Sequence, residues 1–394
     1  MSTRQIPPEF RRTVSAASVL QRLVEFPTYD KDGMGDCANF LSNELQHSGF
    51  NVAVDKLNNV YGTKEFEGRG DPFLINAHFD TVPPSSKWTR DPLRVSVEGD
   101  RLYGLGTSDA KGGIAAILLA LRELNQCRFR KLEVVFANYE DNATVLDGTR
   151  WLGTPYFLSH TRVDAKAGIN VEGTVQGDRF MISLGCGGRV AFDVTVIGKE
   201  AHTAEPAWRT LGRNAIYDMI KVIETLRRLP PAKMTIDDCN VYTDLNVSTI
   251  HGGTVLNVVP GECTIECERR VLPNEKWDDV KAQVESYLRV LRDIEFNVHY
   301  YPPQKSYLID RADPTVALVV SSVQHALGYT PKFRAESGRT DSGYFDELAG
   351  IKTVIVGPGE GITVEHKPDE YTSAKRIEEF SRVMRQMLAP LAPE

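Results

Sequence analysis

Histidine and carboxylate side chains stand at the ends of several apolar segments of this sequence, where they could hold a metal ion. His78 and Asp80 follow the apolar run 72–77, which predicts a buried strand, and alternate residues of a strand share a face. Asp109 stands between a turn-rich link and a helix pattern. The candidates for chemistry are His78, Asp80, Asp109, Glu140, Asp141, Glu172 and His366.

Carboxylates that converge on one crevice repel one another, and each raises the pKa of its neighbours. A divalent cation removes that repulsion, and mixed nitrogen and oxygen ligands favour zinc (Zn2+), with Co2+ or Mn2+ as alternatives. Two histidines and four acids match a two-metal hydrolytic site, in which one carboxylate bridges the ions and a spare acid accepts a proton from water. Each residue alone also has an ordinary explanation: a hydrogen-bonded histidine, a helix N-cap at Asp109, or a solvated acid pair at 140–141.

Size and composition are those of a globular protein with a full core. The chain has 394 residues, which predicts two domains or one large one, and 41% of the residues are hydrophobic and 25% charged. The net charge of -7 is spread without long runs, which argues against a nucleic-acid partner. We find neither a long apolar segment nor an apolar leader, so we expect no membrane partner and a cytoplasmic location. Six scattered cysteines without a CxxC pair predict free, mostly buried thiols.

The order of helix and strand patterns predicts an α/β fold with an insertion. Over residues 1–185 the two patterns alternate, which is typical of a layered sheet whose ligands gather at the strand carboxyl ends. Residues 186–302 alternate apolar and polar positions in the order β-α-β-β-α-β and indicate a separate α+β domain. The alternation of helix and strand patterns seen over 1–185 resumes over 303–394, so we expect this segment to complete the first domain. We expect segment 148–158 to be helical.

Seven short motifs make the sequence similar to the M20 family of metallopeptidases. The resemblance covers nearly the whole chain in order, and the pair formed by HxDTVP and GxxDxKGG is the most specific part of it. The motifs are AHFDTVP (77–83), YGLGTSDAKGG (103–113), YED (139–141), VEGT (171–174), AH (201–202), LNVVP (256–260) and HKPDEY (366–371). The resemblance implies a zinc-peptidase-type α/β catalytic domain with an inserted ferredoxin-like domain, two zinc ions per chain, and a homodimer formed through that domain. It also implies a cis peptide bond after Asp109.

The resemblance further assigns roles by position. Asp80 would orient the ring of His78, Asp109 would bridge the two ions, and Glu140 would be the general base. The implied metal ligands are His78, Asp109, Asp141, Glu172 and His366. The residues implied at the substrate are His202, Asn257, Arg270, Thr340 and Asp341.

Two of the substrate residues have alternatives that the sequence leaves open. His202 resembles the residue that reaches the substrate carbonyl from the partner subunit, where it would stabilise the oxyanion. Arg270 could hold a substrate carboxylate by a bidentate pair, or could belong to a surface ion pair of a strand. Asn257 could bind the substrate or serve as a turn residue before Pro260.

The chain departs from the family pattern at the acid pair. Two adjacent glutamates are usual there, but Glu140 is followed by Asp141, whose side chain is shorter by about 1.5 Å, the length of one C–C bond. A shifted register would put Tyr139 at the base position, and a phenol with a pKa of about 10 is a poor base at neutral pH. We therefore favour Glu140 as the base.

The expected function is a two-zinc hydrolase that cleaves the amide bond of N-acyl amino acids, of the deacetylase or desuccinylase type. The link 88–95 before Asp109 looks more like the deacylases than the peptidases of the family. The alternatives are a metallo-carboxypeptidase or dipeptidase that takes peptide substrates, and a non-catalytic member kept for binding.

Overall fold

The computed structural model describes residues 15–140, 143–146 and 149–390, and its contacts divide the chain into two compact units. The first unit comprises the segments up to residue 184, 309–333, and from 344 onward, and the second comprises 185–308 and 334–343. The sequence placed the insertion at 186–302 and left 334–343 in the first domain. In the structure the N–H of Glu336 donates to the carbonyl of Gly185 at 2.9 Å, so the segment 334–343 joins the second unit.

The first unit is built on an eight-stranded mixed sheet with the order β1-β2-β6-β3-β9-β22-β12-β21. The central strands β6, β3, β9 and β22 run parallel, so their carboxyl ends lie along one edge. This arrangement confirms the predicted layered α/β fold. The strands are β1 (Asn51–Val54), β2 (Val60–Glu65), β3 (Phe73–His78), β6 (Lys131–Ala137), β9 (Ala167–Asn170), β12 (Ile182–Ser183), β21 (Phe333–Arg334) and β22 (Lys352–Ile355).

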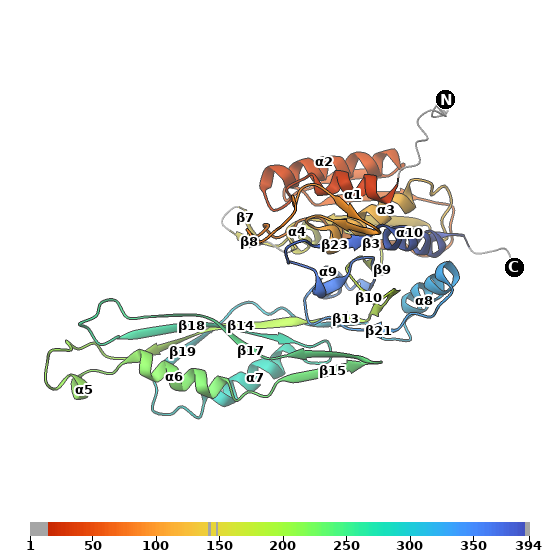
Figure 1. Cartoon of the computed structure of the whole chain (residues 1–394). Coiled ribbons are helices and arrows are strands. Elements are labelled where there is room, and N and C mark those ends of the chain that lie inside the picture. Colours follow the sequence, from red (N-terminus) through yellow and green to blue (C-terminus); the bar gives the residue numbers. More distant parts are fainter. Residues whose placement is uncertain (1–14, 141–142, 147–148, 391–394) are drawn as a thin grey trace. The chain divides into compact units, whose positions relative to one another are not determined.

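Helices cover both faces of this sheet (Figure 1). On one face α3 packs against β3, and α1 and α10 pack against α3. On the other face Phe157 of α4 and Phe345 of α9 are fully buried against Leu74 and Val135, which are side chains of the two central strands. The helices are α1 (Ala16–Val24), α2 (Lys31–His47), α3 (Gly112–Leu121), α4 (Gly153–His160), α8 (Pro314–Leu327), α9 (Asp341–Ala349) and α10 (Ala374–Leu388).

The second unit is an antiparallel sheet of four strands, in the order β17-β18-β14-β19, covered on one face by two helices. Alternate residues of β14 are buried, as its period-two pattern predicts. The chain order β-α-β-β-α-β and the spatial order of the strands are those of a ferredoxin-like fold. The elements are β14 (Gly188–Ile197), α6 (Ala215–Leu226), β17 (Leu245–Gly252), β18 (Glu262–Val271), α7 (Trp277–Leu288) and β19 (Phe296–Tyr300).

Several short elements complete the two units, and one of them corrects the sequence analysis. The helix predicted over 148–158 is wrong at its start, because residues 149–151 form β8 and α4 begins only at Gly153. Pairing with β7 satisfies the backbone of β8 in place of helical hydrogen bonds. The remaining elements are β4 (Ser96–Glu98), β5 (Arg101–Tyr103), η2 (Thr107–Lys111), β7 (Thr144–Leu146), β8 (Thr149–Trp151), β10 (Val175–Gln176), β11 (Arg179–Phe180), β13 (Gly185–Cys186), α5 (Trp208–Leu211), β15 (Ala232–Ile236), β16 (Cys239–Thr243), β20 (Tyr307–Leu308), η3 (Gly361–Thr363) and β23 (Tyr371–Ser373).

Two expectations concern the thiols and the helices. The six cysteines all lie among the described residues, are free, and are buried except for the half-buried Cys239, as predicted. Within the described part of the chain, the helices fall short of the length and apolar character that a bilayer crossing needs.

Close approach of the central strands depends on Gly168 of β9. A Cβ atom at this position would lie 2.3 Å from the carbonyl oxygen of Leu74 in β3. We expect Gly168→Ala to push the two strands apart and to lower the free energy of unfolding by ~1–3 kcal/mol. Chemical unfolding of the purified variant measures this loss.

Gly35 of α2 provides the matched control, because a Cβ atom there would meet no atom within 4 Å. Alanine in a helix interior is more stable than glycine by roughly 0.5–1 kcal/mol, so we expect Gly35→Ala to leave the free energy of unfolding unchanged or to raise it. Equal unfolding midpoints for the two variants would contradict the close strand packing.

Candidate functional site

Three of the predicted metal ligands come together at the carboxyl edge of the first unit's sheet. His78 ends β3, Asp109 lies in η2 just before α3, and Glu172 follows β9. The Nε2 atom of His78 lies 3.0 Å from Oδ1 of Asp109 and 3.5 Å from Oε2 of Glu172. One possible ligand atom from each residue lies within 4.8 Å of the others, so the three could hold a metal ion.

His366 approaches the same aspartate from a distant part of the chain. Its Nε2 atom lies 3.1 Å from Oδ2 of Asp109, whereas His78 contacts Oδ1. The two oxygens of one carboxylate therefore face two different imidazoles. The side chain of His78 is 2% exposed and that of His366 is 50% exposed, so one side of the cluster is buried and the other is open.

Asp80 lies on the far side of the His78 ring and is fully buried. The Nδ1 atom of His78 is 3.2 Å from the carbonyl oxygen of Asp80 and 3.6 Å from its Oδ1. The same Oδ1 accepts a hydrogen bond from the backbone N–H of Glu140 at 3.0 Å. Asp80 thus links the His78 ring to the backbone of the predicted general base. Asp141, the predicted ligand beside that base, lies outside the described residues.

The strand end that carries Glu140 turns sharply at Tyr139. The backbone φ of Tyr139 is 57°, in the left-handed region that non-glycine residues seldom adopt. The side chain of Tyr139 is buried, at 7% exposed. The peptide bond between Asp109 and Ala110 is cis, as the family resemblance led us to expect.

Negative charge from the carboxylates predominates at the cluster. Burial lowers the pKa of His78, but the charges of Glu172 and Asp109 outweigh burial and raise this pKa well above its usual value. Burial raises the pKa of Asp109, but His78 and His366 outweigh it and lower the pKa below its usual range. The site therefore favours added positive charge, and buried imidazole and carboxylate donors are a set that suits a divalent cation.

Three buried residues near the cluster received no role from the sequence. Asn170 donates from Nδ2 to Oε1 of Glu172 at 3.3 Å. Lys111 is fully buried and donates from Nζ to the carbonyl of Phe26 at 2.9 Å, and burial lowers its pKa to about 8. Burial and the charge of Asp109 raise the pKa of Glu370 to about 7, although hydrogen bonds from backbone amides oppose them.

The signals for two of these residues stood inside the quoted motifs. Lys111 follows Asp109 by two positions, and Glu370 follows His366 by four. An acid so close to a predicted ligand could have been examined as its support, because outer hydrogen-bond partners fix metal ligands in place. Asn170 is two residues before Glu172, so it shares a strand face with that ligand.

The loop that leads to His366 lies against the segment that carries Asp109. A Cβ atom on Gly359 would lie 2.2 Å from the carbonyl oxygen of Ser108, so only glycine fits without a shift. The Oγ atom of Ser108 accepts a hydrogen bond from the backbone N–H of Glu360 at 2.8 Å. The loop is therefore in direct contact with Ser108, the residue before Asp109.

The predicted substrate residues lie in the second unit. Nδ2 of Asn257 lies 3.4 Å from Nε2 of His202, and both residues are exposed on adjacent loops. Arg270 donates from Nε to Oε1 of Glu268 at 3.3 Å, so the ion-pair alternative for this residue is realised here. Its side chain remains 39% exposed.

Thr340 and Asp341 lie in the segment 334–343, which belongs to the second unit. Asp341 begins α9 and is 1% exposed. The Oγ1 atom of Thr340 is buried and has no hydrogen-bond partner among the described residues. Both side chains are thus enclosed, unlike His202 and Asn257.

Comparisons with known proteins agree with this geometry. A family model for peptidase family M20/M25/M40 matches residues 74–389. An acetylornithine deacetylase of Salmonella paratyphi B is 28% identical over 351 residues, which cover 86% of this chain and 86% of that protein. An M20 family metallo-carboxypeptidase from Sulfolobus solfataricus has a similar fold, with a TM-score of 0.75, 18% identity, and coverage of 94% of this chain and 98% of that one.

A Bacillus subtilis structure described as a dinuclear metal-binding peptidase of the M20 family also shares the fold, with a TM-score of 0.67, 14% identity, and coverage of 94% and 96%. The family match includes every segment that carries the cluster around Asp109. The chain belongs to peptidase family M20/M25/M40, a family of hydrolytic enzymes.

Proposed function

We propose that this chain is a two-zinc amide hydrolase that removes the acyl group from N-acyl amino acids. The observation that carries the proposal is the carboxylate of Asp109, whose two oxygens face His78 and His366. Such an arrangement suits a carboxylate shared by two ions. Curated relatives named acetylornithine deacetylase, at 26–28% identity, favour the deacylase class of substrate.

The residues present fit two metal ions. His78, Glu172 and one oxygen of Asp109 would hold the first ion. His366 and the other oxygen of Asp109 would hold the second, together with Asp141, which is assigned from the sequence alone. When bound, such ions polarise the scissile carbonyl and lower the pKa of coordinated water from about 15.7 towards ~7. Zinc is our choice because the donor set mixes imidazole and carboxylate.

Glu140 is the proton carrier in this proposal. Its carboxylate accepts a proton from the attacking water and then donates it to the nitrogen of the leaving amine. Asp80 fixes the position of Glu140, because its Oδ1 accepts the backbone N–H of that residue at 3.0 Å. The buried Asp80 also holds the Nδ1 side of His78, which leaves Nε2 for the cluster.

His202 would reach the substrate carbonyl bound to the partner subunit, and Asn257 would bind a polar group of the substrate. An imidazole N–H and an amide N–H are suitable donors for the oxyanion and for a polar group of the substrate. Their side chains already lie 3.4 Å apart, so the two loops present them together. Arg270 would bind the substrate carboxylate in exchange for Glu268, and Thr340 and Asp341 would line the substrate.

A peptidase is the second candidate. Solved structures of similar fold include a metallo-carboxypeptidase and an aminopeptidase, which act on peptides by their names. A panel of N-acetyl and N-succinyl amino acids against short peptides separates the two candidates. Faster turnover of the acyl amino acids supports the deacylase, and faster turnover of peptides supports the peptidase.

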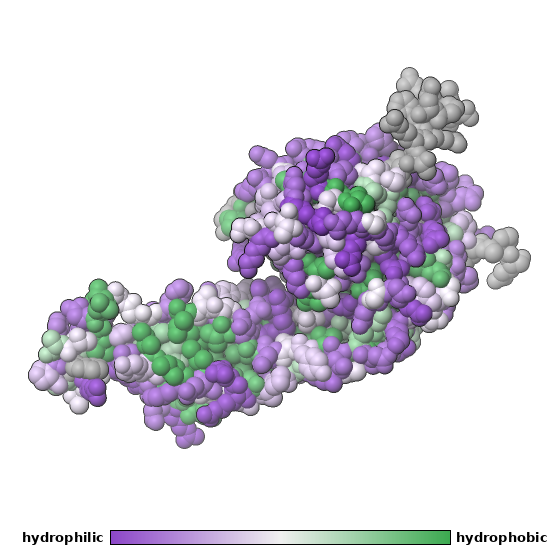
Figure 2. Space-filling view, viewed as in Figure 1, coloured by the Kyte–Doolittle hydropathy of each residue, from purple (hydrophilic) through white to green (hydrophobic). Residues whose placement is uncertain are grey.

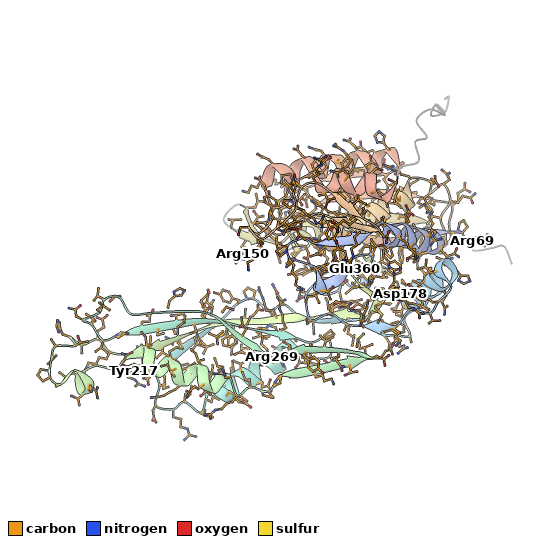
Figure 3. The ribbon with its side chains drawn as sticks, in the orientation of Figure 1. Arg69, Arg150, Asp178, Tyr217, Arg269 and Glu360 are labelled. Carbon is orange, nitrogen blue, oxygen red and sulfur yellow. The ribbon has the colours of Figure 1, made fainter. Side chains whose placement is uncertain are left out.

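We also propose a homodimer formed through the second unit. Three large apolar residues of α6 and β17 are exposed: Tyr217 by 61%, Ile220 by 48% and Ile250 by 52%. Figure 2 shows apolar surface over α6, and Figure 3 marks Tyr217 on the same helix. β17 is an edge strand of its sheet, and a paired edge removes a row of open hydrogen-bonding groups. Free cysteines suit a cytoplasmic location.

Replacing Glu140 with glutamine tests the proposed base. The amide cannot accept the proton, so we expect kcat to fall by about 10²–10⁴-fold while bound zinc is retained. Steady-state kinetics on an acyl amino acid and metal analysis measure the two effects. Glu123→Gln, at an exposed position of the same unit, is the control and should behave as wild type. Near-normal turnover of every accepted substrate by Glu140→Gln would remove this residue from its role.

Metal removal tests the proposed cofactor. We expect purified protein to hold about two zinc ions per chain, because one carboxylate serves two sites. A chelator should abolish hydrolysis, and Zn2+ should restore it. Elemental analysis and activity assays measure both effects. Protein that stays free of metal in excess zinc would favour the non-catalytic alternative.

Charge on the exposed face of α6 tests the dimer. We expect Ile220→Lys to give a monomer, because a dimer would bury the added charge without a partner. Sedimentation velocity measures the mass in solution. Val290→Lys, at a residue that is 67% exposed in the same unit, is the control. An Ile220→Lys protein that sediments as a dimer would place the contact elsewhere.

A further inference from the structure

Glu370 is a buried acid that the mechanism above does not use. It is 3% exposed and stands four residues after His366, directly before β23. Its Oε1 accepts hydrogen bonds from the backbone N–H of Ser108 at 2.7 Å and of Asp109 at 3.0 Å. Its Oε2 accepts one from the N–H of Gly106 at 2.9 Å. One carboxylate thus binds three amides of the segment that carries the shared aspartate.

These contacts join the two chain segments whose side chains meet at the site. Glu370 and His366 belong to one short loop, and the three amides belong to the segment around Asp109. His366 and Asp109 approach to 3.1 Å, a distance that depends on both backbones. We propose that Glu370 is a positioning residue that holds His366 in register with Asp109 and thereby sets the affinity of the proposed metal pair. The proposal rests on the two-metal function proposed above.

Two neighbouring contacts show that this loop is held by the tertiary structure rather than by its own conformation. His366 and Asp369 both have a φ of 57°, in the left-handed region that non-glycine residues seldom adopt. The carboxylate of Asp369 accepts hydrogen bonds from the N–H and the Oγ1 hydroxyl of Thr89, at 3.0 and 2.6 Å. The backbone carbonyl of Glu370 accepts the N–H of Gly104 at 3.0 Å.

The chemistry of the contact calls for a carboxylate at position 370. Three donors converge on two oxygens, and a carboxylate has only acceptors to offer. A glutamine would turn its NH₂ group toward at least one of these amides, so that two donors would face each other. The buried amide would then lack a partner, which destabilises the arrangement it belongs to.

Zinc affinity of the full-length chain tests the proposal. Wild type, Glu370→Gln and Glu379→Gln are stripped of metal and titrated with Zn2+ against a chromogenic chelator. Glu379 is the matched control, because it is a buried acid of α10 that pairs with Arg376 at 2.7 Å. We expect Glu370→Gln to bind Zn2+ about 10–100-fold more weakly than wild type, and Glu379→Gln to match wild type.

The visible spectrum of the Co2+-loaded proteins gives a readout that general destabilisation would not change. We expect the Co2+ bands of Glu370→Gln to shift while those of Glu379→Gln match wild type. Equal affinities and spectra for wild type and Glu370→Gln would overturn the proposal, and so would equal losses in both variants. Should Glu370→Gln fail to fold, Glu370→Asp keeps the charge but shortens the side chain, so that it should no longer reach all three amides and should also bind Zn2+ more weakly than wild type; an affinity equal to wild type would overturn the proposal. Wild-type protein that binds no Zn2+ would instead overturn the proposed function.

Discussion

Repulsion among carboxylates at one edge of the sheet is the constraint on which the rest of this molecule depends. β3 and β9 are parallel neighbours, so the residues that follow them lie at the same edge of the sheet. At this edge His78 and Glu172 lie close to Asp109, which comes from the segment before α3. In a buried place these acids would raise one another's pKa values unless positive charge is present. The raised pKa of His78 shows that the site favours such charge. A bound cation would relieve this repulsion.

The packing around the edge is organised to hold that arrangement. Lys111 is fully buried, and burial lowers its pKa to about 8, while the charges of Cys37, Glu370 and Asp80 oppose that effect. Gly359 lets the loop that carries His366 approach the backbone of Ser108, which no side chain at this position would permit. This close backbone contact beside the cluster helps to fix ligands that come from distant parts of the chain.

Sequence reasoning succeeded where the cause was local. The apolar run before His78 and the alternation along β14 depend on neighbours in the chain, so their strands could be predicted. It failed where the cause was distant. Glu370 stands inside the motif HKPDEY, but the amides that it binds lie more than 260 positions away in the sequence, so its contact with the segment around Asp109 could not be predicted. Residues 334–343 join the second unit through contacts with Gly185 and its neighbours, which no composition shift marks.

The ion pair of Arg270 with Glu268 bears on how the substrate would be chosen. An exposed pair contributes about 0–1 kcal/mol, because water screens both charges and the side chains lose freedom. The side chain of Arg270 is 39% exposed and that of Glu268 is 30% exposed, so a carboxylate of the substrate could replace Glu268 with little loss of free energy. Arg189 of β14 is paired with Arg270 of the neighbouring strand β18, and its Nη1 atom lies 3.6 Å from Oε2 of Glu268. Two guanidinium groups then share one acid, so, if Arg270 binds the substrate as proposed, this pair would favour a substrate that has a carboxylate.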